Sequence, residues 1–301
     1  MDQIDISLSL LLSKNSRMPL RSLAEQLSLS PSAVHKRMQD LIDIGIIQRF
    51  STGLSFKALP GFIVTLNGRS QASSLQKNMQ QIGKHPSVYK IVIAAGNYVY
   101  IHAVLKDISD LETFTNTIQE QTDLSNTEIL LIPSPMPVKK TEDRSLSNLD
   151  YRLIHALSKN SRKLNTELAE ELGISSKTVQ RRLNYLETNE LIGYGIHWVP
   201  TASTDIISFF HVMVNDIAKK DDIIRDLQSN YHPTILSISK SSSNPTLLIL
   251  NVWTKTMKQI KTLHQDLENT NWFSQVYSNI FYDLMMFDTW RDDYIKDHIQ
   301  L

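Results

Sequence analysis

The chain of 301 residues contains one segment twice, and this internal repeat constrains the fold more than any other feature of the sequence. The first copy begins at Asp5 and the second at Asp150, and they stay in register without a gap as far as Ile47 and Ile192. Both copies contain the hexapeptide Leu-Ser-Lys-Asn-Ser-Arg. A repeat of this kind indicates a duplicated structural unit, so an interpretation of one half can be tested on the other.

Each copy has the pattern of a short helix, a tight turn and a second helix. In the first copy, Leu23 and Leu27 lie on the apolar stripe of the short helix, and Ser30-Pro31 begins the next helix. A serine hydroxyl caps a helix by accepting from an unpaired backbone N–H, and proline is tolerated at the first helical position. The second copy repeats the pattern at 168–183. The sequence therefore predicts two helix-turn-helix motifs, whose second helices enter the major groove of DNA.

The second helix of each motif has a polar, partly basic outer face. Arg37 and Arg182 occupy equivalent positions and are predicted to contact a phosphate or a base edge. The structural alternative is a salt bridge to a neighbouring carboxylate such as Asp40 or Glu187. The helical spacing places eight further candidates for DNA contact on the same outer faces: Ser32, His35, Lys36, Gln39, Lys177, Gln180, Arg181 and Asn184.

Composition excludes several classes of protein. The chain has no cysteine, which excludes disulfides, thiolate metal sites and a cysteine nucleophile. The histidines lack metal-ligand spacing, and there is no phosphate-binding glycine loop or nucleophile elbow, so the sequence predicts no metal, cofactor or catalytic residue. A net charge of +0 argues against a general polyanion binder, so contact with double-stranded DNA must come from local clusters.

The location of the protein is also predicted from its sequence. The N-terminus is acidic and lacks the basic start and apolar core of a signal peptide. The longest apolar runs, at 91–95 and 247–250, fall far short of the roughly 20 residues of a membrane helix. The sequence therefore predicts a cytoplasmic protein with no membrane contact.

A small β wing is predicted after each motif. In the first half, two short strands at 46–50 and 54–56 would flank a turn at 51–53, and the equivalent wing would lie within 191–199. A wing usually touches the phosphate backbone beside the groove, which makes Arg49 a further candidate for DNA contact. The alternative is that Arg49 is a solvated surface charge.

After each wing the predicted order of elements changes to β-α-β-β-α-β. The first half has strands at 61–66, 88–94, 98–105 and 128–132, and helices at 71–85 and 108–121. The second half has strands at 206–214, 235–239, 247–253 and 276–286, and helices at 220–229 and 257–268. This is the order of the ferredoxin-like fold, in which both helices cover one face of a four-stranded sheet. The other face alternates apolar residues and needs a partner.

The sequence thus predicts an α+β chain of six segments. Two winged helix-turn-helix domains alternate with two ferredoxin-like domains, a proline-rich linker separates the halves, and an extra helix follows the second half. The predicted boundaries, in chain order, are 1–58, 59–132, 133–147 for the linker, 148–200, 201–287 and 288–301.

This plan resembles the Lrp/AsnC (feast/famine) family of prokaryotic transcription regulators. The resemblance rests on Asp5, Leu23-Ala24-Glu25, Ser30, Val34, Arg37, Leu41 and Gly45-Ile46-Ile47, and on Asp150, Leu168-Ala169-Glu170, Ser175, Val179, Arg182, Leu186 and Leu191-Ile192. It implies a dimer in which two βαββαβ sheets pack face to face. Because one chain holds both copies, the sheets of 61–132 and 206–286 are expected to form an intramolecular pseudo-dimer. Its two unlike recognition helices would read an imperfect palindrome.

The resemblance also implies a small-molecule effector and further assembly. Many members bind an amino acid near a Gly-x-x-Asp motif, and here Gly96, Asn97 and Tyr98 are the candidate effector residues. The acidic position is Val99, and the second half keeps neither the glycine nor the acid, which disfavours an amino acid. Family members form rings of dimers, so the resemblance leaves a homo-oligomer open.

Two other functions stay open at this point. Siroheme decarboxylases share the two-module plan, sometimes as fused pairs, but have largely lost DNA binding, whereas both recognition helices here keep a cap and basic outer residues. A chromosome-organising protein with little sequence preference is the second alternative, which the zero net charge disfavours. Tetrapyrrole absorbance would identify the first, and the salt dependence of DNA binding the second.

Overall fold

The computed structural model describes residues 1–132 and 146–299, so most of the predicted linker at 133–147 lies outside the described residues. The described residues form two compact units, and each unit draws on both halves of the chain. The sheet unit contains Met1–Gln3, Phe62–Ile132 and Pro200–Phe287. The helix-turn-helix unit contains the described parts of Ile4–Gly61, Pro133–Val199 and Asp288–Leu301. The two helix-turn-helix segments therefore belong to one unit, and the two ferredoxin-like segments belong to the other. The six predicted boundaries stay a prediction.

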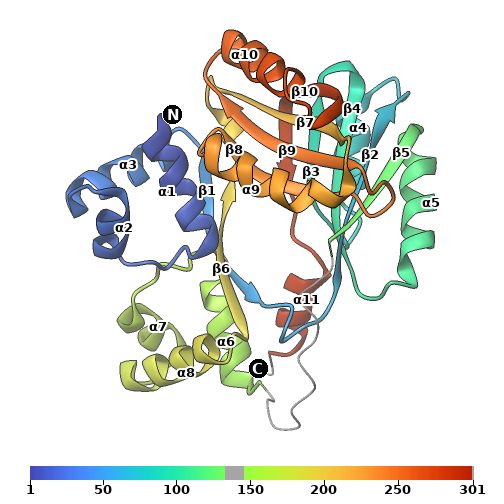
Figure 1. The fold of residues 1–301 in the computed structure, drawn as a ribbon. Helices are drawn as coiled ribbons and strands as arrows, with labels where there is room; N and C mark the ends of the chain where they lie inside the picture. The colour runs from blue at the N-terminus through green and yellow to red at the C-terminus, as the bar shows by residue number, and fades with distance from the viewer. Residues whose placement is uncertain (133–145, 300–301) are drawn as a thin grey trace. The chain divides into compact units, whose positions relative to one another are not determined.

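The sheet unit contains the predicted β-α-β-β-α-β order twice (Figure 1). The first half supplies β2 (Phe62–Ser70), α4 (Leu75–Ile82), β3 (Val88–Ala94), the short 3-10 turn η1 (Ala95–Asn97), β4 (Tyr98–Leu105), α5 (Asp110–Thr122) and β5 (Leu124–Ile132). The second half supplies η2 (Pro200–Ala202), β7 (Ile206–Val214), η3 (Ile217–Lys219), α9 (Lys220–Asn230), β8 (Ile235–Lys240), β9 (Leu247–Thr254), α10 (Met257–Glu268) and β10 (Phe273–Met286).

One strand joins the two halves of the sheet unit. The strand order is β5-β2-β4-β3-β10-β7-β9-β8, in which each half has the ferredoxin-like arrangement. β10 is 14 residues long. Its first part pairs with β7, from Phe273 to Ile280, and its last part pairs with β3, from Phe281 to Met286. A single eight-stranded sheet thus spans both halves within one molecule.

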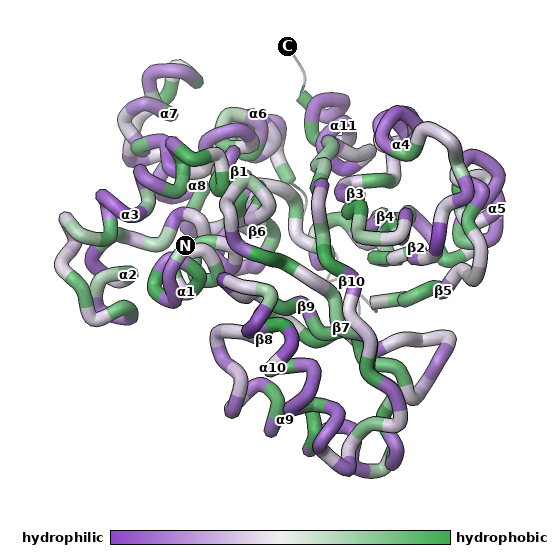
Figure 2. Tube along the Cα trace, turned by 90° about the horizontal axis from the view of Figure 1, so that it is seen from above, coloured by the Kyte–Doolittle hydropathy of each residue, from purple (hydrophilic) through white to green (hydrophobic). Residues whose placement is uncertain are grey.

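Side chains that alternate along the strands make two helix-covered cores. On β4, Ile101 and Ala103 are fully buried against Met79 of α4 and Ile118 of α5. The equivalent core of the second half lies beneath α9 and α10. Hydrophobic colour concentrates in the strands of Figure 2, while α5 is largely hydrophilic. Burial of one helix face and one sheet face is the arrangement that the predicted amphipathic patterns require.

The opposite faces of the two half-sheets pack on each other, which confirms the predicted pseudo-dimer. The rings of Tyr100 on β4 and Phe209 on β7 lie 4.5 Å apart, and the Tyr100 hydroxyl is 2.7 Å from Nε2 of His211. The covered faces were expected to be apolar, and that expectation is wrong in part. The helix side is mainly aliphatic, whereas the side between the half-sheets contains hydrogen-bonding aromatic side chains such as Tyr100 and His211.

The helix-turn-helix unit contains two three-helix motifs, two strands and the extra helix. Its elements are α1 (Gln3–Lys14), α2 (Leu20–Leu27), α3 (Pro31–Asp43), β1 (Ile47–Leu54), α6 (Asn148–Leu157), α7 (Asn165–Leu172), α8 (Ser176–Thr188), β6 (Ile192–Trp198) and α11 (Trp290–Asp297). α11 buries Ile295 in the core of the second motif. Within the described part of the chain, no helix is long and apolar enough to cross a membrane.

The predicted wing hairpins are wrong. β1 runs without a turn through the segment expected to reverse, and it pairs antiparallel with β6 of the other half, from Phe50 opposite Ile196 to Leu54 opposite Ile192. The expected turn residue Gly53 lies opposite Gly193 inside this ribbon. A strand from the equivalent motif supplies the hydrogen bonds that a hairpin partner would have supplied, so each wing is a single strand.

Candidate DNA-binding surface

The two recognition helices begin and pack as the sequence predicts. The hydroxyl of Ser30 accepts from the backbone N–H of Ala33 at 3.2 Å and caps α3, with Pro31 at the first helical position. Ser175 caps α8 in the same way. Equivalent apolar side chains bury the inner faces of these helices: Val34, Met38 and Leu41 on α3, and Val179, Leu183 and Leu186 on α8. The opposite face of each helix is left for solvent or for a ligand.

The two equivalent arginines form salt bridges with the first helix of their own motif. Nη1 of Arg37 lies 2.7 Å from Oδ1 of Asp5. Arg182 donates from both Nε and Nη2 to Asp150, whose side chain is 0% exposed, and these bonds raise the pKa of Arg182. The bridging carboxylates are therefore the repeated aspartates, and not the suggested Asp40 and Glu187. Contact of either arginine with DNA stays a prediction.

The other predicted contact residues on α3 and α8 are exposed. Ser32 forms a hydrogen bond with Ser30 at 3.0 Å, and Gln39 donates to Asp43 at 2.8 Å. Gln180 donates to Asn184 at 2.6 Å. Within the described residues, the side chains of four members of the set make no hydrogen bond or ion pair: His35, Lys36, Lys177 and Arg181. The exposed cations of this set are the groups available for phosphates or base edges.

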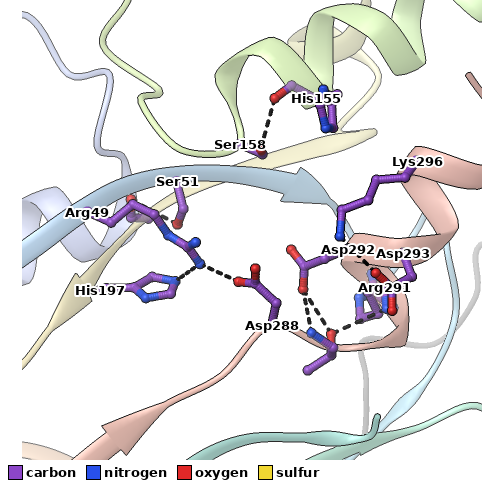
Figure 3. Close-up of polar contacts among 12 residues, drawn as sticks. Arg49, Ser51, His155, Ser158, His197, Asp288, Arg291, Asp292, Asp293 and Lys296 are labelled. Atoms are coloured by element: carbon purple, nitrogen blue, oxygen red, sulfur yellow. Dashed lines mark hydrogen bonds and ion pairs between the residues drawn. The ribbon is translucent and has the colours of Figure 1, made fainter. Parts of the chain in front are cut away.

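Arg49, predicted as a wing contact, is held inside the unit (Figure 3). Its Nη2 lies 2.8 Å from Oδ1 of Asp288 and 2.5 Å from Nε2 of His197. Burial and the charge of Arg49 lower the pKa of His197 to about 4, so the imidazole is neutral and accepts from the guanidinium. This cluster borders a pocket of about 270 Å³ that also includes His155, Lys159 and Lys296. A DNA contact of Arg49 stays a prediction, and the structure gives the side chain a different partner.

The sequence reasoning missed a reciprocal contact between the two motifs. The hydroxyls of Ser16 and Ser161 lie 2.6 Å apart. Nη1 of Arg17 donates to the carbonyl oxygen of Ser161 at 2.5 Å, and Nη1 of Arg162 donates to that of Ser16 at 2.6 Å. These residues end the repeated hexapeptide, so its identity in both halves was the available signal. Two identical segments that meet across a pseudo-two-fold axis hold the motifs together.

The candidate effector residues lie at the turn between β3 and β4. Gly96 and Asn97 have φ angles of +70° and +58°, a conformation that favours glycine and asparagine. The hydroxyl of Tyr98 donates to Asn67 at 2.8 Å. Val99, at the position of the family acid, is fully buried in the aliphatic core. An effector role for Gly96, Asn97 and Tyr98 stays a prediction.

Two segments of the chain match known family models. Residues 1–48 match the model described as winged helix-turn-helix DNA-binding. Residues 146–187 match the AsnC-type helix-turn-helix domain. The two matches fall on the two motifs that the internal repeat predicts.

Curated relatives identify the family. An HTH-type transcriptional regulator of Pyrococcus furiosus is 30% identical over 124 residues, which cover 39% of this chain and 82% of the relative. The chain belongs to the Lrp/AsnC family. The Lrp/AsnC relationship extends to the regulator AldR of Mycobacterium tuberculosis, 29% identical over 142 residues that cover 44% of this chain and 77% of AldR. Each alignment uses less than half of this chain and most of the relative. Together with the two matched helix-turn-helix segments and the doubled β-α-β-β-α-β order, this shows that the Lrp/AsnC chain holds the family unit twice.

Solved structures give a match over the whole chain. The siroheme decarboxylase NirDL, alone and with an iron-uroporphyrin III analogue, aligns with TM-scores of 0.59 and 0.60. The alignments cover 98% of both chains at 12% sequence identity. At this identity the likeness shows the fold alone, and it agrees with the predicted fold class.

Proposed function

We propose that this chain regulates transcription by reading an operator of two unlike half-sites with one molecule. The two matched helix-turn-helix models and the regulator relatives support DNA binding. The reciprocal contacts of Arg17 and Arg162 and the β1–β6 ribbon join the motifs within one unit, which supports their use as a pair. Two joined motifs bind two half-sites whose spacing the protein fixes.

The difference between the two recognition surfaces is the observation that carries this proposal. At equivalent positions, α3 presents His35 and Lys36, whereas α8 presents Gln180 and Arg181. Side chains of different hydrogen-bonding capacity prefer different base edges in the major groove. The operator is therefore expected to be an imperfect palindrome.

Loss of one exposed cation should affect one half-site. Lys36→Ala and Arg181→Ala are each expected to weaken binding to a selected duplex roughly tenfold, because each removes one contact to a phosphate or base edge. The measurement is selection from randomised duplexes, followed by titration of the enriched sequence at several salt concentrations. Lys258→Ala on α10 is the charge-matched control, because Lys258 is also exposed but lies in the sheet unit.

The results of this experiment separate the alternatives. Two different enriched motifs, one weakened by each variant, would support the proposal. Binding without enrichment, but with a steep salt dependence, would favour a chromosome-organising protein. No binding at low salt by protein that is shown to be folded would reject DNA recognition.

The proposal extends to a small-molecule effector at Gly96, Asn97 and Tyr98, where an exposed turn leads into β4. A Cβ atom at Gly96 would lie 3.6 Å from Nη2 of Arg69, so this cation is close enough to attract a carboxylate or another anion at the turn. A rise of the melting temperature with anionic metabolites, absent in Arg69→Gln, would support it. A homo-oligomer and a cytoplasmic location complete the proposal, and sedimentation and cell fractionation test them.

A siroheme-decarboxylase-like enzyme is the second candidate, favoured by the alignment of NirDL over 98% of this chain. Visible absorbance of the protein mixed with iron uroporphyrin tests it directly. A shifted band would support tetrapyrrole binding, whereas an unchanged spectrum together with DNA selection would leave the regulator as the function.

A further inference from the structure

A chain of side-chain hydrogen bonds runs from the first motif onto the recognition helix of the second. Nη2 of Arg17 donates to Oδ1 of Asn165 at 3.1 Å. Nδ2 of Asn165 donates to Oε1 of Gln180 at 2.5 Å, and Nε2 of Gln180 donates to Oδ1 of Asn184 at 2.6 Å. We call these four residues the amide chain. It ends on the exposed face of α8, at two of the predicted DNA-contacting residues.

The direction of the amide chain is fixed by Arg17. An amide side chain can usually turn over, which exchanges the positions of its oxygen and its NH₂ group. Its orientation is fixed where a neighbour can only donate or only accept. A guanidinium has donors only, so the oxygen of Asn165 must face Arg17 and its NH₂ must face Gln180. Gln180 must then accept through its oxygen and donate through its NH₂ group to the oxygen of Asn184. The oxygen of Asn184 accepts from Gln180, so both N–H donors of Asn184 and one lone pair of its oxygen remain for a ligand.

The first motif has the opposite arrangement. Gln39 is the equivalent of Asn184, and its Nε2 donates to Oδ1 of Asp43 at 2.8 Å. A carboxylate only accepts, so the oxygen of Gln39 is left for a ligand together with one N–H. The equivalent of Asn165 is Leu20, which cannot extend such a chain. The two recognition helices thus differ at this position in hydrogen-bonding direction as well as in residue type.

We propose that Arg17 and Asn165 are positioning residues that set the base preference of the second recognition helix. With both N–H donors free and its oxygen turned towards Gln180, Asn184 suits guanine, whose N7 and O6 both accept in the major groove. With one acceptor and one donor, Gln39 suits adenine, which offers N6–H and N7. One half-site therefore has guanine where the other has adenine. This inference rests on the proposed function.

The isosteric variant Asn165→Asp gives the sharpest test. Aspartate would accept from both Arg17 and Gln180, so Gln180 would turn its oxygen towards Asn184, and Asn184 would present its own oxygen. The variant should therefore change the preference at one position of the second half-site from guanine to adenine. The expected preference of the wild type is about tenfold, as for a bidentate contact to a base.

Two further variants control the experiment. Asn165→Leu, the residue of the first motif at this position, should abolish the preference, because it breaks the amide chain. Thr166→Leu changes an exposed neighbour on α7 outside the chain and should leave both half-sites unchanged. Selection from randomised duplexes with each full-length variant, folded by circular dichroism, measures the preference at every position.

The results distinguish failure of this inference from failure of the proposed function. If the wild type enriches no motif, the proposed function fails and the inference with it. If the wild type enriches two half-sites and Asn165→Asp keeps the guanine preference, the proposed function stands and the inference is wrong. A merely structural role of Asn165 would lower affinity without exchanging one base for another.

Discussion

Replacing Arg182 with methionine is expected to lower the free energy of unfolding by about 3–5 kcal/mol. The change removes the charged partner of the Asp150 carboxylate, whose side chain is 0% exposed, and leaves it only the hydrogen bonds from the N–H and hydroxyl of Ser147. A buried charge without an opposite charge costs far more than the net contribution of the pair. Urea denaturation of the full chain, followed by circular dichroism, measures the loss.

Neighbouring and equivalent positions provide the controls. Arg181→Met changes an exposed side chain on the same helix and should alter stability by no more than about 0.5 kcal/mol. Arg37→Met should have a smaller effect than Arg182→Met, because the side chains of Arg37 and Asp5 are 30% and 17% exposed. Adding Asp150→Asn to Arg182→Met should restore part of the loss, since a neutral amide is less costly to bury. Equal effects of Arg181→Met and Arg182→Met would contradict the assignment.

Acidification from pH 7 to pH 5 is expected to destabilise the sheet unit through His211. This imidazole lies between the half-sheets with 0% of its side chain exposed, and burial lowers its pKa from 6.5 to about 4. The unfolded chain therefore takes up a proton at a pH where the folded chain does not, so stability falls as the pH drops below about 6.5. For one such group the loss amounts to about 2 kcal/mol at pH 5.

The His211→Gln variant isolates this contribution. Glutamine keeps a hydrogen-bonding group for Tyr100 but does not titrate, so the variant should lose about 2 kcal/mol less than the wild type between pH 7 and pH 5. The comparison is needed because burial raises the pKa of Glu128, which acts in the opposite sense on acidification. His35→Gln makes the same substitution at an exposed position on α3, outside the sheet unit, and serves as the matched comparison. Parallel curves for the wild type and His211→Gln would show that His211 does not titrate as proposed.

Local periodicity predicted most of the fold. The bounds expected for β3, β4, β7 and α10 agree with the structure at both ends, because alternating or helical burial is recorded in consecutive residues. The capping residues Ser30 and Ser175 were also correct. Such patterns report which face of an element is buried, but they place some ends less well. The strand expected at 61–66 is β2 (Phe62–Ser70), and the helix expected at 71–85 is α4 (Leu75–Ile82).

Partners distant in the sequence were not predicted. β1 was taken as half of a hairpin because periodicity indicates a strand but does not say which strand lies beside it. Arg37 and Arg182 were considered with carboxylates on their own helix, whereas the repeated Asp5 and Asp150 at equal spacing in both halves were the better signal. The link from Arg17 to Asn165 had no such signal, because only the second half has an amide at that position.

The pairing of β10 with both β7 and β3 has a consequence for how the protein responds to its own abundance. A regulator assembled from two chains separates on dilution, and it can exchange a subunit with a related protein. Here the second recognition helix is always present at a high effective concentration, because it belongs to the same polypeptide as the first. Pairing of the two recognition helices should therefore require no association step between separate chains. This pairing should not form mixed dimers with another family member. The sequences of the two recognition helices can therefore diverge without affecting the pairing of the two half-sheets.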